Sequence, residues 1–197
     1  YADEYFYDKN SMPVLLLNIT LKDGRSGAGT GFIISDSGLA LTCAHVVKDT
    51  TKVTARLTIK GRFGGDHTYH NCKVLKINEE LDMALIQLEG IHFPTLKLTS
   101  YDYKVKRGED IALIGYPLAT QTNETYTNFE GKIASNEHHD KAGEVYFINS
   151  EAKQGNSGSP VILKDTGEVI GILCGSVLGN NKDLQEEINY IRPIKYF

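Results

Sequence analysis

The sequence predicts an all-β protein, and three observations support that prediction. Most of the chain falls into short runs rich in Val, Ile, Leu, Phe and Tyr, the residues that strands favour. Clusters of turn-forming residues such as KDG, SDSG and KDTG separate these runs. No apolar pattern of helical period is sustained over ten or more residues. Many short strands joined by turns indicate a barrel or a sandwich.

The chain begins with an arm, residues 1–12, that precedes the first expected strand and carries the aromatic cluster Tyr5, Phe6 and Tyr7. Two interpretations are open: the arm packs on its own barrel, or it makes a contact in a homo-oligomer. In chain order, the expected strands cover residues 14–21, 29–34, 39–42, 53–59, 83–88, 111–116, 144–150, 160–163, 168–175 and 188–194.

Composition narrows the classes of partner. The net charge is −4, the pI is about 5.9, and no long run of like charge occurs, so neither a nucleic-acid nor a membrane partner is expected. The longest apolar runs are far too short to span a bilayer. No signal peptide is visible, although a chain that starts at Tyr1 without Met leaves export from a longer precursor open.

The three cysteines, Cys43, Cys72 and Cys174, lie far apart in the sequence. An odd number without CxxC spacing argues against a disulfide framework and against a zinc site. We therefore expect three buried free thiols and no metal or cofactor. Free thiols favour a reducing, cytoplasmic compartment.

The stretch QGNSGSPV, residues 154–161, surrounds Ser157 with residues that permit a tight turn. Such a turn has a structural explanation, but it also suits a nucleophile. Gly155 allows a backbone conformation in which its own amide and that of Ser157 converge on one point, as an oxyanion hole requires. A serine nucleophile also needs a base and an acid that orients the base.

Two other segments supply candidates for these partners. His45 lies in ALTCAHVV, directly after an apolar strand, where its ring is fixed against a core while one edge stays free. Asp82 lies in ELDMALIQL, directly before an apolar strand, where a carboxylate is costly unless it is hydrogen-bonded. A surface histidine and a capping aspartate are the structural alternatives. The order His, Asp, Ser is far more specific than the serine loop alone.

The segments around His45, Asp82 and Ser157 together resemble those of a known protein family. The chain resembles chymotrypsin-fold serine proteases, and most of it, from about Val14 to Ile194, is similar to the HtrA (Deg) type. The similarity lies in GAGTGFIISDSGLALTCAHVV, LDMALIQLEG and LKLTSYDYKVKRGEDIALIGYPLA. It implies two six-stranded antiparallel barrels with the site in the cleft between them, in one domain over 1–197 with a boundary between its halves near 95–110.

The resemblance also implies roles: His45 as general base, Asp82 as its orienting acid, Ser157 as nucleophile, and Gly155 with Ser157 as oxyanion donors. Polypeptides are then the substrates. The alternative is a catalytically silent or partner-activated protease-like binding domain of a larger regulatory protein.

Some residues depart from the family pattern. The GNSGSP loop resembles that of glutamyl endopeptidases, but Leu173 stands where those enzymes have a pocket histidine, so their preference is not carried over. Asn156 replaces the Asp that receives a new N-terminal amine in the trypsin group.

The resemblance places the primary specificity pocket in residues 151–155 and 173–176, including Ser176. Glu151 on the pocket floor would favour Lys or Arg, whereas Ala152 and Leu173 suit a small apolar side chain, which we favour.

Overall fold

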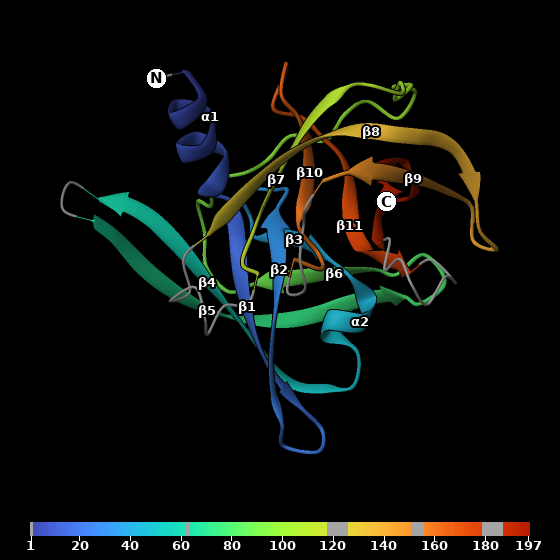
Figure 1. Ribbon diagram of the computed structural model, residues 1–197. Coiled ribbons are helices and arrows are strands. Elements are labelled where there is room, and N and C mark those ends of the chain that lie inside the picture. The colour runs from blue at the N-terminus through green and yellow to red at the C-terminus, as the bar shows by residue number, and fades with distance from the viewer. Residues whose placement is uncertain (1, 62–63, 118–125, 151–155, 179–186) are drawn as a thin grey trace.

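The structure is a computed structural model that describes residues 2–61, 64–117, 126–150, 156–178 and 187–197. Its strands form two closed six-stranded antiparallel barrels, β1-β2-β3-β6-β5-β4 and β10-β11-β12-β9-β8-β7, which confirms the predicted fold class (Figure 1). Within the described residues, none of the helices has the length and apolar character that a membrane crossing requires.

The first barrel and its helices occupy the first half of the chain. Their bounds are α1 (Ala2–Ser11), β1 (Val14–Leu21), β2 (Ser26–Ile33), β3 (Leu39–Thr42), α2 (Ala44–Val47), β4 (Thr50–Gly61), β5 (Gly64–Asn78) and β6 (Met83–Leu88). The second barrel follows with β7 (Asp110–Gly115), β8 (Thr127–His139), β9 (Glu144–Asn149), β10 (Pro160–Leu163), β11 (Val169–Leu178), β12 (Glu187–Pro193) and the 3₁₀ turn η1 (Ile194–Tyr196).

Four elements of the described chain were not predicted from the sequence: strands β5 and β8, helix α1 and the 3₁₀ turn η1. Both strands are largely polar, and β8 buries Ile133 alone among its residues, so the apolar signal of a strand is weak. Helix α1 has three consecutive aromatic residues where a helical period would space them, so its pattern does not indicate a helix.

Aromatic side chains attach helix α1 to the body of the protein. Tyr7 is buried and donates its hydroxyl hydrogen to Glu130 Oε1 on β8 at 2.7 Å. Phe6 packs against the same core, whereas Tyr5 is exposed. The helix therefore lies against its own chain, and a homo-oligomer contact through the N-terminal aromatic arm stays a prediction.

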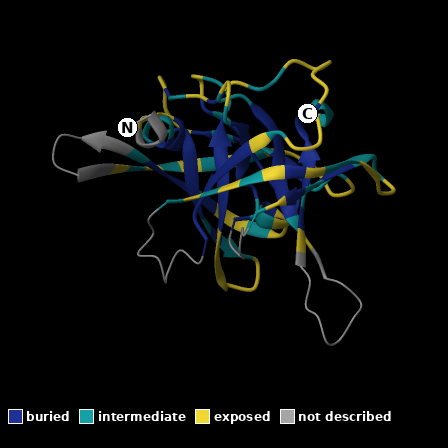
Figure 2. Cartoon of the chain, turned by 45° about the horizontal axis from the view of Figure 1, so that its top comes forward, coloured by how far each residue is buried: buried dark blue, intermediate teal, exposed yellow. Residues whose placement is uncertain are grey.

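The apolar core has three parts, one inside each barrel and one between them. Alternate residues of β1 serve two parts: Leu15 and Leu17 fill the first barrel, and Leu16 faces the layer between the barrels. On β7, Leu113 fills the second barrel and Ile114 faces the shared layer. This two-sided burial explains the continuous apolar runs of these strands and appears as the dark blue centre of Figure 2.

Thr30 on β2 links the two barrels through hydrogen bonds in this shared layer. Its backbone N–H donates to the carbonyl oxygen of Ser157 at 3.1 Å, and its Oγ1 accepts from the backbone N–H of Tyr116 at 3.1 Å. Its carbonyl oxygen accepts from Thr42 Oγ1 at 2.7 Å. Thr30 and Thr42 are fully buried, so these bonds form away from water. The bonds to Ser157 and Tyr116 fix one barrel against the other, whereas the bond from Thr42 lies within the first barrel.

We expect Thr30→Val to lower the free energy of unfolding by about 1–3 kcal/mol, because the buried N–H of Tyr116 loses its acceptor. Urea unfolding followed by circular dichroism measures the change. Thr30→Ser is the matched control, since it keeps the acceptor and loses one methyl group. A valine variant as stable as the wild type would contradict this role of the hydroxyl.

Candidate active site

His45 lies in α2, a single helical turn that directly follows β3. Its neighbours Ala44 and Val47 are buried and anchor the turn in the first barrel. The His45 side chain itself is 51% exposed. The ring is therefore fixed at its backbone but accessible at its edge, as the sequence predicted for this position.

Asp82 lies at the end of the turn before β6 and binds His45 at two points. Its Oδ1 accepts the backbone N–H of His45 at 2.9 Å, and its Oδ2 lies 2.6 Å from ring Nδ1. The φ angle of Asp82 is 54°, in the left-handed region that Asp tolerates better than most residues. An ionised carboxylate needs a donor, so Nδ1 carries the proton and Nε2 is left to accept one.

The hydrogen bond that His45 donates to Asp82 raises the pKa of His45, and partial burial opposes the rise. A carboxylate beside an imidazole stabilises the charged form. The pair therefore stabilises the fold at pH below the unfolded pKa of histidine, and this contribution is lost as the pH rises through the folded pKa. As a base, His45 is competent above its raised pKa.

Ser157 lies in the turn before β10, half-buried, and both barrels hold that turn. The carbonyl of Ser157 accepts from Thr30 of the first barrel. The N–H of Gly158 donates to the carbonyl of Leu173 on β11 at 2.9 Å. Gly158 has a φ of +93°, and a Cβ there would lie 1.9 Å from the Thr30 carbonyl oxygen, so only glycine fits.

The structure brings His45 and Asp82 into direct contact and places Ser157 in a separate turn. Among the described residues, no hydrogen bond joins His45 to Ser157. The neighbouring Asn156 is fully buried, with its Oδ1 3.5 Å from Ser159 Oγ. Its Nδ2 is buried and has no hydrogen-bond partner within the described residues.

The predicted substrate-binding residues lie partly outside the described chain. Gly155, Glu151 and Ala152 are among the residues that the structure leaves undescribed, so their roles stay predictions. Leu173 is buried in the core of the second barrel, and its backbone N–H donates to Ser159 at 3.0 Å. Ser176 is exposed on β11.

Two thiols lie beside the Asp82 carboxylate, an arrangement that sequence spacing did not reveal. Cys43 directly precedes α2, and Cys174 lies on β11 of the other barrel. Burial, followed by hydrogen bonding with Cys174, raises the pKa of the Cys43 thiol well above its ordinary value. The thiol is therefore protonated near neutral pH, where it is a weak nucleophile.

Comparison with known proteins identifies the class. A family model described as "Trypsin-like peptidase domain" matches residues 29–172, which include His45, Asp82 and Ser157. The match covers most of the chain, and the chain belongs to this family of chymotrypsin-fold peptidase domains.

Curated relatives identify the type within that class. A "Probable periplasmic serine endoprotease DegP-like" of Pseudomonas fulva is 34% identical over 148 residues, which are 73% of this chain and 28% of the relative. "Serine protease HTRA4" of Mus musculus is 30% identical over 78% of this chain and 31% of its own length. The chain is thus an HtrA-type protease domain that spans under a third of the length of these relatives.

Solved structures share the fold. A serine endoprotease from Yersinia pestis has a TM-score of 0.77 at 20% identity and matches 98% of this chain and 62% of its own. The active form of the Rv3671c protease from M. tuberculosis also has a TM-score of 0.77, at 22% identity, over 98% of this chain and 81% of its own.

We expect Asp82→Asn to lower the pKa of His45, because an amide neither carries the negative charge nor accepts as strongly from the imidazolium. Titration of the His45 ring signals by NMR measures the change. Glu79→Gln is the matched control, since Glu79 pairs with Lys48 in the same region and leaves the His45 bonds intact. An unchanged His45 pKa in Asp82→Asn would refute the electrostatic coupling of the pair.

Proposed function

We propose that the chain is a serine endopeptidase that cleaves polypeptides through an acyl-enzyme, with His45, Asp82 and Ser157 as its triad. The single observation that carries this proposal is the two-point hydrogen bonding of Asp82 to His45. Membership of the trypsin-like peptidase domain family and the serine protease names of the curated relatives support it.

Each residue then has a defined step. The Ser157 hydroxyl oxygen attacks the carbonyl carbon of the scissile bond, and its proton passes to Nε2 of His45. The imidazolium next protonates the leaving amine, and the acyl group stays on Ser157. A water molecule, deprotonated by Nε2, hydrolyses this ester and restores the hydroxyl. Asp82 keeps Nδ1 protonated throughout and stabilises the imidazolium.

The backbone of the serine turn serves the developing oxyanion. In the proposed arrangement the N–H groups of Gly155 and Ser157 donate to it, and each such donor contributes about 3–4 kcal/mol to the transition state. The hydrogen bonds that hold Ser157 and Gly158 to the two barrels support this role, because preorganised donors need no rearrangement during the reaction.

We expect a fluorophosphonate probe to add covalently to the oxygen of Ser157, because a base-activated serine attacks phosphorus as it attacks a carbonyl. Intact mass followed by peptide mapping locates the adduct. Ser157→Ala should stay unlabelled, whereas Ser100→Ala, which replaces an exposed serine elsewhere, should label like the wild type. A folded wild-type protein that takes up no probe would reject the proposed function.

We expect His45→Ala to slow cleavage of an unfolded polypeptide by roughly a millionfold, and Asp82→Ala by roughly ten-thousandfold, as in enzymes with the same three groups. A fluorogenic peptide pool measures kcat/KM for each variant. The wild-type rate should fall on acidification at a pH above the ordinary imidazole pKa, since Asp82 raises that of His45. His139→Ala, at an exposed histidine of β8, is the control. Full activity in Asp82→Ala would show that another group orients the base.

A further inference from the structure

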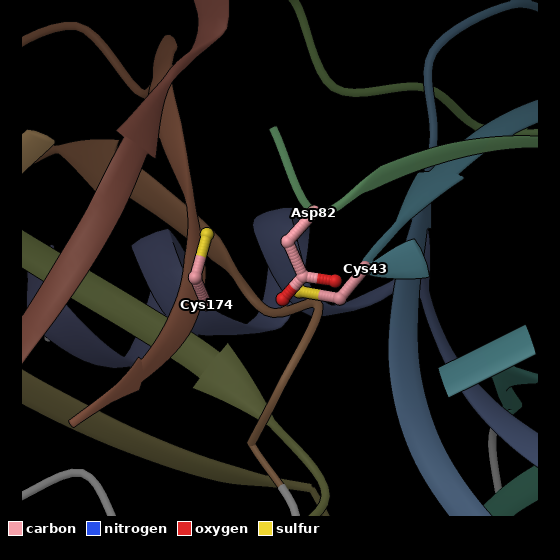
Figure 3. A group of neighbouring side chains, drawn as sticks. All are labelled: Cys43, Asp82 and Cys174. Atoms are coloured by element: carbon pink, nitrogen blue, oxygen red, sulfur yellow. The ribbon is translucent and has the colours of Figure 1, made fainter. Parts of the chain in front are cut away.

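Cys43, Asp82 and Cys174 form a compact group of metal-binding side chains (Figure 3). Their two sulfur atoms and a carboxylate oxygen all lie within 4.8 Å of one another. The three residues come from separate places in the fold: the position between β3 and α2, the turn before β6, and β11 of the second barrel. The fold therefore assembles at one point donors that are far apart in the sequence.

The two cysteines of the group are buried, Asp82 is partly exposed, and hydrogen bonds hold both sulfur atoms in place. Cys43 and Cys174 are 0% and 4% exposed. The Cys43 thiol donates to the carbonyl oxygen of Leu173 at 3.0 Å, and the Cys174 thiol donates to that of Ile172 at 3.4 Å. Both sulfur atoms thus lie against the backbone of β11, and the Asp82 carboxylate faces them from the first barrel (Figure 3). The side chains therefore lose little conformational freedom when an ion binds.

The donor set selects the kind of ion. Two sulfurs and one carboxylate suit zinc, whereas Mg²⁺ and Ca²⁺ require oxygen ligands throughout. Tetrahedral zinc places sulfur and oxygen ligands about 3.5–3.8 Å from one another. Small rotations about χ1 supply the remaining approach of about 1 Å. The fourth position is left for water.

We propose that Cys43, Asp82 and Cys174 bind Zn²⁺, and that the bound ion inhibits the enzyme by withdrawing Asp82 from His45. Two thiols and the carboxylate take up one Zn²⁺ and release two protons, which leaves a complex of net charge −1. An oxygen that ligates zinc accepts less strongly from Nδ1 of His45, so the ring loses its fixed tautomer. The inhibitory part rests on the proposed function, whereas zinc binding does not.

Zinc binding is tested on the reduced protein by calorimetry, with Co²⁺ as a spectroscopic substitute. We expect one ion per chain and thiolate-to-cobalt charge-transfer absorption. Cys43→Ser and Cys174→Ser should each weaken zinc binding by more than about tenfold, since loss of even an indirect partner of a ligand costs that much. Cys72→Ser is the matched control, because Cys72 lies on β5 outside the group. Circular dichroism verifies that each variant folds.

X-ray absorption of the zinc-loaded wild type tests the same claim without any variant. Two sulfur atoms at about 2.3 Å from zinc are expected. Absence of zinc binding to the reduced wild type, zinc without sulfur neighbours, or equal affinity in folded Cys43→Ser and Cys174→Ser would each overturn the site.

Inhibition is tested separately, by the ratio of peptidase rates with and without zinc in each variant. We expect a loss of up to about ten-thousandfold in the wild type and in Cys72→Ser, reversed by EDTA, and little loss in Cys174→Ser. An enzyme that binds zinc through the cysteines but keeps its full rate overturns the inhibitory role alone. A protein that is inactive without zinc but binds the ion refutes the proposed function and leaves the metal site standing.

Discussion

The hydrogen bonds of Thr30 across the two barrels are the constraint on which the candidate site depends. The first barrel carries His45 and Asp82, and the second carries Ser157. Among the described strands no ladder joins the two barrels, so their relative position rests on packing in the shared layer and on a few buried polar contacts. Thr30 is hydrogen-bonded to Ser157 in the serine turn and to Tyr116, which directly follows β7. It therefore fixes the position of the serine turn relative to the barrel that carries His45 and Asp82.

Burial explains how much of the fold the sequence predicts. Ten of the twelve strands in the described chain have apolar runs because they face a barrel core, the layer between barrels, or both. Strands β5 and β8 lack such runs, since much of their surface meets solvent, and their pairing comes from the neighbouring strands instead. Helix α1 forms without a helical apolar period and is held by Tyr7 and Phe6. Where tertiary contacts determine the secondary structure of a segment, the local sequence carries no pattern from which it could be predicted.

The candidate site is predictable to a different degree. His45 and Asp82 were found because each combines a polar group with an adjacent buried strand, and the structure brings them within hydrogen-bonding distance. The backbone conformation that allows this contact is visible only in the structure. Asp82 has a left-handed φ, which directs its carboxylate toward α2. The meeting of Cys43 with Cys174 depends on how the two barrels dock, which spacing along one chain does not encode.

The position of Asp82 gives its carboxylate two sets of neighbours, and this duality follows from the fold. The two carboxylate oxygens each accept one bond from His45. The same carboxylate also lies beside the thiols of Cys43 and Cys174, which pack on β11 (Figure 3). The interface between the barrels shields the Asp82 side chain in part, leaving it 24% exposed, and a less polar surrounding strengthens its bonds to the imidazole. The same interface supplies sulfur donors that hold a soft cation far better than water does. In the proposed zinc site, the cation and His45 would compete for one carboxylate, so zinc bound to the thiol pair would act on His45 through Asp82.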